Sequence, residues 1–377
     1  MSGPLTGVRV VELAAIGPAP FGVMLLADLG AEVIRVDRAA AARGEVGMEA
    51  MMVGLSRNRR SVAVDLKHEQ GREVVLRLVE DADVLVEGFR PGVAERLGVG
   101  PEDCEAVNPR LVYARMTGWG QDGPLAPRAG HDIDYAAIAG ILHTVGRSDE
   151  PPPPPVNYLA DFGGGGVYLA LGVLAALLER ERSGRGQVVD AAMVDGAASL
   201  TTFVHGLKAM GAWRDERGVN LLDGGAPYYD TYRCADGRFL AIGALEGPFF
   251  AELCAGLGID PEELPQLDQD AWPEQKRRIA EIVATRTRDE WAEVFAETDA
   301  CVAPVLDLAE APEHPHNVAR EAFVEVDGHA QPAPAPRLSR TPGEVRTGAP
   351  APGEHTDEVL AALGLDVGAL REAGAIA

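Results

Sequence analysis

The stretch VRVVELAAIGPAPFGVMLLADLGAEVIRV, residues Val8–Val36, decides the fold of this chain. Its two ends, Val8–Leu13 and Glu32–Val36, are short apolar runs that predict buried strands. Between them, Pro20–Leu29 is apolar at helical spacing and stops at Gly30, as helices often do. A strand, a helix and a strand in this order predict two parallel strands joined by a crossover helix.

The alternation of helices and strands continues along the chain. Asp83–Glu87 and Leu111–Met116 predict two further strands, each preceded by a helical stretch, around Glu69–Glu80 and Pro101–Ala106. The strongest helix prediction is Tyr168–Arg182, where Ala and Leu residues lead to a charged end and the stop SGRG. This alternation predicts an α/β fold with a mainly parallel sheet that is covered by helices.

A second, smaller domain is predicted after about Ala198. Tyr228–Ala244 alternates around a turn that indicates a hairpin, and helical segments follow at 250–257, 272–284 and 287–298. The Pro- and Ala-rich stretch Gln331–Gly353 is expected to be a connector, and the tail helix Asp357–Leu363 to pack back on the first domain. The predicted division is 1–198 for the large α/β domain, 199–228 for a linker, 229–310 for the small α+β domain, and 311–377 for the return linker and tail.

The composition allows a sizeable core and argues against some classes of partner. The chain has 377 residues, of which 46% are hydrophobic, which suits two domains. With 58 acidic and 34 basic residues its net charge is −24, which argues against a nucleic-acid or anionic-membrane binder. The longest apolar run, Val167–Leu178, is too short to span a bilayer, and the N-terminus lacks an export pattern. The cysteines form no C-x-x-C pair, so we expect reduced thiols in a cytoplasmic enzyme.

A dinucleotide site at the first strand–turn–helix unit is rejected. The turn reads AAIGPAPFG, residues Ala14–Gly22, and lacks the G-x-G-x-x-G pattern. Pro18 and Pro20 have no backbone N–H to donate where a pyrophosphate would need donors. The glycines Gly163–Gly166 permit close approach of a ligand or of another helix, and the two explanations are about equally good.

Three short segments each offer one side chain that can move protons. They are AGHDIDY, YLADFGGGG and GALEGPFF, and they carry His131, Asp161 and Glu246. A histidine and a carboxylate are the groups needed to remove a proton from one face of a carbon and return one on the other. A second carboxylate can fix the tautomer of the histidine and stabilise its charged form. Each of the three residues also has a simpler explanation, as a cap or as the start of a helix.

The order of motifs over nearly the whole chain resembles the family III CoA-transferase superfamily and, within it, the α-methylacyl-CoA racemases. The resemblance implies a Rossmann-like large domain and an interlocked homodimer in which each ring-like chain is threaded through its partner. It also implies that Glu246 of one subunit reaches His131 of the other. The motifs are LTGVRVVELA, DLGAEVIRVDR, RNRRSVAVDLK, ADVLVEGFRPGVAERLG, NPRLVYARMTGWGQDGP, GHDIDYAAIAG, LADFGGGG, GRGQVVDAAMVDG, GALEGPFF and GEHTDEVLAALGL.

The superfamily contains two reactions that have to be distinguished. The transferases use the aspartate that corresponds to Asp161 as a nucleophile, whereas they usually carry G-F-D where this chain has Gly130–His131–Asp132. The resemblance therefore implies an isomerase, a racemase or epimerase of 2-methyl-branched acyl-CoA thioesters. The alternatives are a family III CoA-transferase with Asp161 as acyl-accepting nucleophile, and a non-catalytic acyl-CoA-binding protein.

A racemase of this kind transfers a proton through an enolate. His131 is expected to remove the α-proton of one epimer while protonated Asp161 protonates the opposite face, and the roles reverse for the other epimer. The expected donor to the enolate oxygen is a backbone N–H near Asp132, at the start of a helix predicted over Gly130–Tyr135. We expect partial desolvation beside Phe162 and the glycines to raise the pKa of Asp161, so that its protonated form is available.

Coenzyme A is expected as a part of the substrate rather than as a separate cofactor, and no metal is expected. Arginine suits the phosphates of CoA, because one guanidinium group binds two oxygens. A further basic cluster, Arg57, Arg59 and Arg60, favours an anion site in so acidic a chain. The acyl chain stays open. By resemblance, the CoA-binding residues are Arg38, Val64, Asp65, Leu66, Lys67, Phe89, Arg90, Arg96, Gly130, Ile133, Asp134 and Tyr135.

Overall fold

The computed structural model describes residues 3–45 and 47–377, which divide into two compact units. The first unit comprises Met1–Ala139, Pro155–Leu200 and Ala319–Ala377, and the second comprises Gly140–Pro154 and Thr201–Val318. This division differs from the predicted one in three segments, because 140–154, 201–228 and 311–318 all belong to the second unit. An ion pair of 3.2 Å between Arg147 and Asp230 ties the first of these segments to its unit.

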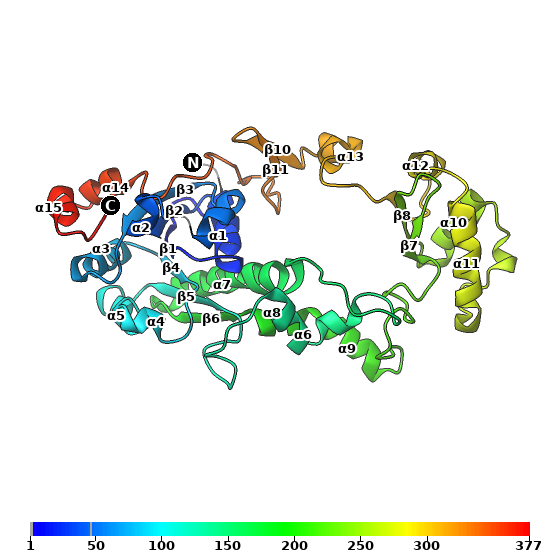
Figure 1. Ribbon diagram of the computed structural model, residues 1–377, viewed down its shortest axis with the longest axis horizontal. Helices are drawn as coiled ribbons and strands as arrows, with labels where there is room; N and C mark the ends of the chain where they lie inside the picture. The colour runs from blue at the N-terminus through cyan, green and yellow to red at the C-terminus, as the bar shows by residue number, and fades with distance from the viewer. Residues whose placement is uncertain (1–2, 46) are drawn as a thin grey trace. The chain divides into compact units, whose positions relative to one another are not determined.

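The first unit is built on a parallel sheet of six strands in the order β3-β2-β1-β4-β5-β6 (Figure 1). All neighbouring strands run parallel. The strand order reverses between β1 and β4, and in open sheets of this kind ligands bind outside the carboxyl ends at that point. The strands are β1 (Arg9–Leu13), β2 (Glu32–Arg38), β3 (Arg59–Val64), β4 (Val84–Glu87), β5 (Val112–Thr117) and β6 (Val188–Ala192).

The α/β class and the mainly parallel sheet are confirmed, and four of the six strands match predicted ones. The two that the sequence analysis missed, β3 and β6, lie at the two edges of the sheet. β3 opens with two arginines, and the buried Arg59 pairs with Glu12 at 2.5 Å and donates to backbone carbonyl groups, including that of Pro20 at 2.8 Å. In β6 only the last two residues are buried, so no apolar run marks the strand.

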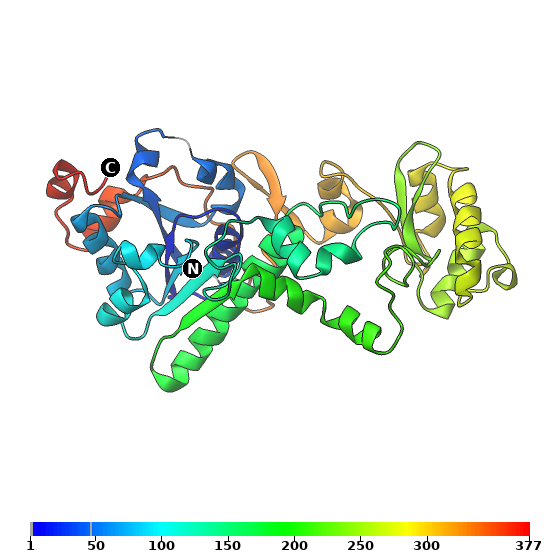
Figure 2. The ribbon, with the colours of Figure 1, turned by 60° about the horizontal axis from the view of Figure 1, so that its bottom comes forward.

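Helices cover both faces of the sheet. On one face, α3 (Glu69–Glu80), α5 (Pro101–Val107) and α14 (Thr356–Ala362) contribute to one core cluster with β1 and β4. On the other, α1 (Pro18–Asp28) packs against α7 (Val167–Ser183), the long green helix in Figure 2, and α7 packs on β5 and β6. The first unit also contains α2 (Ala39–Ala42), a 3-10 helix η1 (Met48–Leu55), α4 (Val93–Arg96), α6 (Asp132–Ile138), α8 (Met193–Leu200), α15 (Val367–Glu372) and the hairpin β10 (Phe323–Val326)–β11 (His329–Pro332).

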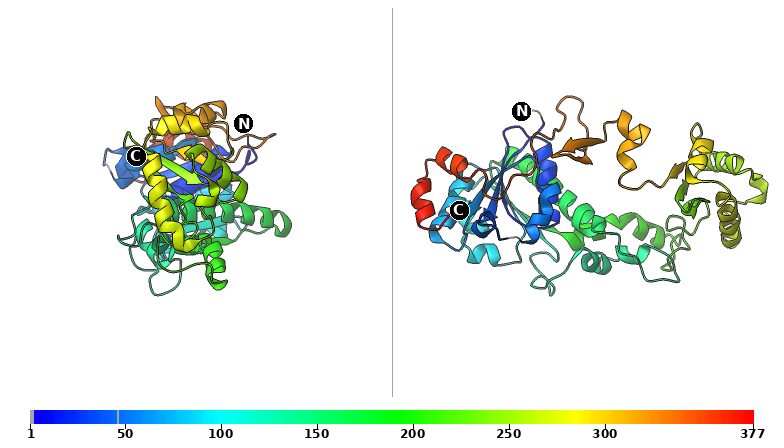
Figure 3. Two further views of the ribbon diagram at one scale, coloured as in Figure 1. Left: turned by 90° about the vertical axis from the view of Figure 1, so that its right-hand side faces the viewer. Right: turned by 45° about the horizontal axis from the view of Figure 1, so that its top comes forward.

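The C-terminal tail packs on the first unit, which confirms the prediction for it (Figure 3). Val359 and Leu360 of α14 and Ile376 are buried in the same cluster as the strands. The hydroxyl of Thr356 accepts the N–H of Ala63 in β3 at 3.0 Å. The edge strand β3 is therefore covered by the end of the chain.

The helix α7 is preceded by a π-helical segment, η3 (Tyr158–Gly166), which contains the glycine run. Together they form a helix of 26 residues, in which an 18-residue window has a mean hydropathy of 1.6; among the described residues it alone is long and apolar enough to cross a membrane by length and composition. The predicted apolar run Val167–Leu178 is one part of this longer helix, whose start at Tyr158 was not predicted. A Cβ at Gly164 would lie 2.5 Å from the backbone N of Ala197, and one at Gly166 would lie 2.7 Å from the carbonyl oxygen of Pro18. The glycines thus let α8 and α1 approach η3 closely, which confirms the packing explanation.

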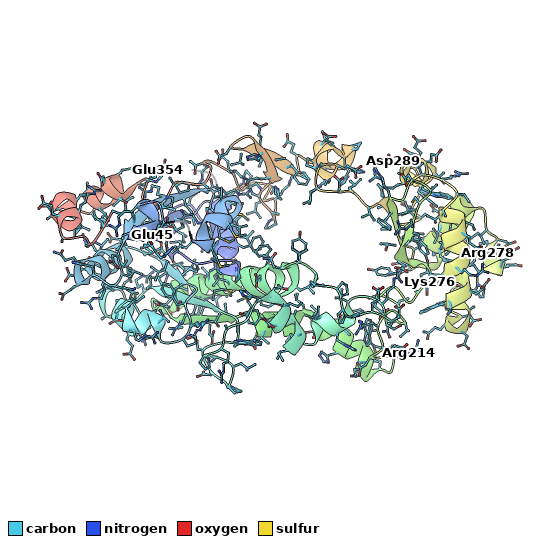
Figure 4. The ribbon with its side chains drawn as sticks, viewed as in Figure 1. Glu45, Arg214, Lys276, Arg278, Asp289 and Glu354 are labelled. Atoms are coloured by element: carbon cyan, nitrogen blue, oxygen red, sulfur yellow. The ribbon has the colours of Figure 1, made fainter. Side chains whose placement is uncertain are left out.

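The second unit has a three-stranded antiparallel sheet with helices against it. The predicted hairpin is confirmed as β7 (Tyr229–Arg233) and β8 (Phe239–Gly243), which β9 (Val302–Pro304) extends. Lys276, labelled in Figure 4, reaches from α11 to Asp230 of β7 at 2.6 Å. The helices are α9 (Thr202–Ala209), α10 (Gly247–Leu257), α11 (Trp272–Val283), α12 (Arg288–Phe295) and α13 (Pro315–Ala319), with 3-10 turns η2 (Ile141–Thr144), η4 (Pro261–Glu263), η5 (Gln269–Ala271) and η6 (Ala311–Glu313).

Candidate active site

Two cavities lie at the carboxyl ends of the strands in the first unit. The Asp161 cavity, of about 440 Å³, is lined by the turn after β1, by residues 88–91 after β4 and by residues 116–119 at the end of β5. The Arg38 cavity, of about 390 Å³, is lined by residues that follow β1, β2 and β3. Phe89 lines both cavities. Since the strand order reverses between β1 and β4, this is the place where a doubly wound sheet binds its ligand.

Asp161 lies in the π-helical segment η3 with its side chain half-buried at the wall of the first cavity. Burial raises the pKa of this carboxyl group, and the charge of Asp132 raises it further, while Asn157 and His131 act in the opposite direction. The amide of Asn157 donates to Oδ2 at 3.2 Å. The net upward shift agrees with the expected desolvation and makes the protonated form more available near neutral pH.

The turn after β1 has to be small where it meets Asp161. Gly17 has φ 69°, in the left-handed region, and a Cβ placed on it would lie 3.2 Å from Oδ2 of Asp161. A larger residue at this position would be both strained and crowded. The GPAP turn thus lies directly beside the carboxyl group of Asp161.

Asp132 fixes the backbone that carries Asp161. Its Oδ1 accepts the N–H groups of Ala160 at 2.8 Å and of Asp161 at 2.7 Å. The residue is only 5% exposed, and its Oδ2 has no hydrogen-bond partner in the described part of the chain. The side chain of Asp132 therefore positions the neighbouring segment and does not face the cavity.

His131 lines the same cavity as Asp161, from the residue that precedes α6. Its side chain is exposed, and its backbone N–H donates to Asp134 Oδ2 at 2.9 Å. The first backbone N–H groups of a helix, here beginning with Asp132, have no acceptor within the helix. An imidazole and a carboxyl group are thus brought to one cavity, the first by the residue that precedes α6 and the second by η3.

Nine of the twelve predicted ligands of CoA line one or both of the two cavities. Tyr135 is buried beside the first cavity, where it meets Trp119 edge-to-face at 4.7 Å, and burial raises its pKa to about 12. Gly130, Tyr135 and Arg90 line the Asp161 cavity. Neither cavity is lined by Arg96, Ile133 or Asp134. The Arg38 cavity is lined by Arg38, Val64, Asp65, Leu66, Lys67 and Phe89.

In the basic cluster at 57–60, Arg57 and Arg59 are paired within the fold, whereas the side chain of Arg60 is 42% exposed. Arg57 and Arg59 are both buried, and they pair with Asp28 and Glu12, each at 2.5 Å. The charges of these two arginines are thus balanced by carboxylates of the fold itself. The sequence does not reveal such long-range partners, and the anion site at this cluster stays a prediction.

Glu246 belongs to the second unit, where it is exposed and directly precedes α10. Its negative charge, after the effect of burial, raises the pKa of the Cys301 thiol, so the two side chains are neighbours. Its expected contact with His131 across a subunit boundary stays a prediction.

Several residues at the Asp161 cavity were not predicted. Asn157, Trp119 and Arg128 line it, as do three methionines of η1, Met48, Met51 and Met52. A methionine-rich stretch is visible in the sequence as MEAMM, and it was a signal that the analysis did not use. Among the residues with described positions, no three His, Cys, Asp or Glu side chains gather as they would around a metal ion.

The fold and the site define a class of α/β proteins with a doubly wound parallel sheet and two cavities at the carboxyl ends of its strands. The chain belongs to CoA-transferase family III, whose family model matches residues 5–356. It is 51% identical to the alpha-methylacyl-CoA racemase of Mus musculus over 364 residues, 96% of this chain and 93% of that protein. It is 47% identical to the alpha-methylacyl-CoA racemase of Homo sapiens over 363 residues, again 96% of this chain and 93% of that protein.

More distant relatives share the fold and include transferases. The beta subunit of the succinyl-CoA–L-malate CoA-transferase of Chloroflexus aurantiacus is 34% identical, over 95% of this chain and 93% of its own. A crystal structure of a CAIB/BAIF family protein from Brucella suis superposes with a TM-score of 0.81 at 28% identity, covering 96% of this chain and 100% of that chain. The similarity to racemases is therefore well above that to this transferase.

Proposed function

We propose that this protein is a racemase of 2-methyl-branched acyl-CoA thioesters. The observation that carries the proposal is that His131 and Asp161 line one cavity, with Asp161 held by the carboxylate of the residue next to His131. Relatives named alpha-methylacyl-CoA racemase, at 51% and 47% identity over most of the chain, support it. The transferase alternative shares Asp161 but gains no support from these relatives.

The proposed reaction is a proton transfer through an enolate. His131 removes the α-proton from one face while the carboxyl group of Asp161 gives a proton to the other, so that the stereocentre inverts. The C–H bond that breaks is replaced by a new one on the opposite face, and the thioester stays intact. The raised pKa of Asp161 supports this role, because the carboxyl group has to carry a proton in one direction of the reaction.

The enolate needs a donor at its oxygen. The N–H of Asp132 is proposed for it, since it belongs to the first turn of α6 and has no acceptor within the helix. One oriented donor of this kind is typically worth about 3–4 kcal/mol to the transition state. Asp132 thus acts twice, through its N–H on the substrate and through its carboxylate on Asp161.

Coenzyme A is proposed as the part of the substrate that crosses both cavities. Its nucleotide suits the Arg38 cavity, which offers Arg38, Arg43 and Lys67 to phosphate oxygens, and its thioester end suits the Asp161 cavity. Phe89, between the two, would contact the pantetheine arm. No separate cofactor is needed for this reaction.

A homodimer is proposed, with Glu246 of one subunit beside His131 of the other. Large apolar side chains on one stripe of α7 support a partner surface: Val167, Leu171 and Leu178 are 45%, 58% and 61% exposed. The cytoplasm is proposed as the compartment, because the four cysteines, all of them in the described part of the chain, are unpaired.

Hydrogen exchange at the α-carbon tests the proposal. In D₂O, the protein should introduce deuterium at the α-carbon of 2-methylhexanoyl-CoA, with loss of optical purity and no loss of thioester. His131→Ala and Asp161→Asn should abolish the exchange. His143→Ala, which changes an exposed histidine of the second unit, is the matched control and should exchange normally. Acyl transfer between CoA donors without α-exchange would establish the transferase instead.

A further inference from the structure

A buried ionic network joins the ends of β4 and β5 to α4. Glu87, the last residue of β4, is fully buried, and its Oε1 accepts Nε of Arg115 at 2.9 Å. The same guanidinium group donates to both oxygens of Glu95 in α4, from Nη1 at 2.8 Å and from Nη2 at 3.3 Å. One arginine thus bridges two carboxylates, one inside the core and one at its surface.

The network encloses the loop that carries Phe89. The backbone N–H of Phe89 donates to Oε2 of Glu87 at 2.6 Å, at the start of the loop, and Glu95 holds the helix that follows it. The loop also lies close to the turn after β1, because a Cβ on Gly88 would be 2.8 Å from the Cβ of Ala15. Both ends of the loop are therefore fixed to the sheet.

The position of this loop decides the shape of both cavities. Phe89 lines the Asp161 cavity and the Arg38 cavity, while Arg90 and Pro91 line the former. A buried ion pair contributes little net stability compared with apolar side chains of the same volume. The network is better explained by the geometry that it imposes on the loop than by the stability that it adds.

We propose that Arg115, together with Glu87 and Glu95, is a positioning group that sets the CoA-binding loop between the two cavities. This inference rests on the proposed function, since it assumes that one CoA thioester occupies both cavities. The network does not touch His131 or Asp161, which α6 and η3 hold through Asp132. Loosening it should weaken the binding of CoA and leave the proton transfer in the bound complex largely unchanged.

Glu95→Ala is the variant that tests the inference most directly. It removes the outer carboxylate, whose side chain is 45% exposed, and leaves the buried pair of Arg115 and Glu87 intact. The Kd for free CoA, measured by calorimetry, should rise about ten-fold, the usual effect of losing a charged hydrogen bond. The KM for 2-methylhexanoyl-CoA should rise in parallel, with kcat within about two-fold of the wild-type value, because only binding is changed. Arg115→Lys, which keeps the charge but not the two-pronged contact, should act in the same direction.

Asp83→Asn is the matched control for lost stability. Asp83 pairs with the buried Arg180 at 2.8 Å, directly before β4 and so at the opposite end of the same strand. This variant should lower the Tm at least as much as Glu95→Ala does, and it should bind CoA as the wild type does.

The outcomes separate the two hypotheses. A wild-type protein that does not bind CoA would overturn the proposed function and the positioning role with it. A wild-type protein that binds CoA, with a Glu95→Ala variant that binds equally well, would overturn the positioning role alone. Equal losses of CoA binding in Glu95→Ala and Asp83→Asn would also overturn it, since the effect would then follow general stability.

Discussion

At the scale of single residues, the carboxylate of Asp132 links the two halves of the candidate site. It accepts two backbone N–H groups of η3, those of Ala160 and Asp161, and it lies next to His131 in the chain. Asp132→Ala would leave both N–H groups without an acceptor in a buried place. Because a hydrogen bond to a charged group is worth about 1.5–3 kcal/mol, we expect the rate of α-hydrogen exchange to fall about 10- to 100-fold.

Asp132→Asn is the control for this prediction. The amide oxygen of Asn can still accept both N–H groups, so the position of Asp161 should be kept and most of the exchange rate retained. If Asn and Ala at this position cost the same, the anchoring role of the carboxylate would be contradicted.

The same variant makes a prediction about pH. The proposed pair, His131 and Asp161, is active when the two groups share one proton, and the two forms that act on the two epimers differ only in where this proton lies. The exchange rate should therefore be bell-shaped in pH, with the same limits for both epimers. Burial and the negative charge of Asp132 raise the pKa of Asp161. Removing that charge makes the last proton easier to lose, so Asp132→Asn should move the falling limb of kcat/KM to lower pH.

Rates measured from each epimer between acid and alkaline pH check this prediction. An unmoved limb, or a limb moved to higher pH, would show that Asp132 does not act on Asp161 through its charge.

Sequence reasoning named candidate side chains for proton transfer but did not predict the contacts that hold them. His131 and Asp161 stand in short segments with distinctive neighbours, and the structure brings them to one cavity. Asn157 and Gly17 could not be predicted, because their contacts with Asp161 depend on how a loop and a turn meet in space. The partners of the buried arginines Arg57 and Arg59 could not be predicted for the same reason.

At the scale of elements, the glycine run of η3 is a packing device. Gly164→Ala would place a methyl group 2.5 Å from a backbone atom of α8, which cannot move away cheaply. Overpacking of this kind costs about 1–3 kcal/mol, so the Tm should fall, as thermal denaturation would show. Gly206→Ala in α9 is the control, since nothing lies within 4 Å of its added Cβ. It should be neutral or stabilising by up to about 1 kcal/mol.

Helices and strands with a clear apolar period were predictable, and those held by other forces were not. α3 was predicted with its observed ends, Glu69 and Glu80, because its apolar residues recur on one face. β3 depends on a buried ion pair and on the tail that covers it, and η3 depends on glycines that a period-based analysis treats as breaks. Local patterns record burial against a neighbour, but they do not identify the neighbour.

At the scale of the whole molecule, the sequence predicted a parallel α/β part, an α+β part and a returning tail. It did not predict that 140–154 joins the second unit, because the tie is an ion pair between residues 83 positions apart. Neither the composition nor the hydrophobic periodicity of a sequence predicts a contact between residues so far apart in the chain.

The proposed dimer predicts complementation between inactive variants. If Glu246 serves His131 of the partner, a heterodimer of His131→Ala and Glu246→Ala chains contains one intact site and one doubly altered site. Co-expressed with two different tags and purified through both, it should regain about half of the wild-type exchange rate per dimer, as two-fold symmetry requires.

The control pairs His131→Ala with Asp161→Asn. Both changes lie in the first unit, so neither site of that heterodimer is intact and no activity should return. Recovery in the control, or none in the test pair, would contradict the shared site.

The phenyl ring of Phe89 lines both cavities, and this has a consequence for substrate selectivity. If the protein binds the nucleotide and the pantetheine arm of CoA on the two sides of this ring, most of the binding free energy comes from CoA. That part of the affinity is then independent of the acyl group on the thioester sulfur. Such a protein would be selective for CoA and would accept a range of acyl groups. Thioesters shortened to N-acetylcysteamine would then be handled poorly, however well their acyl chains fit.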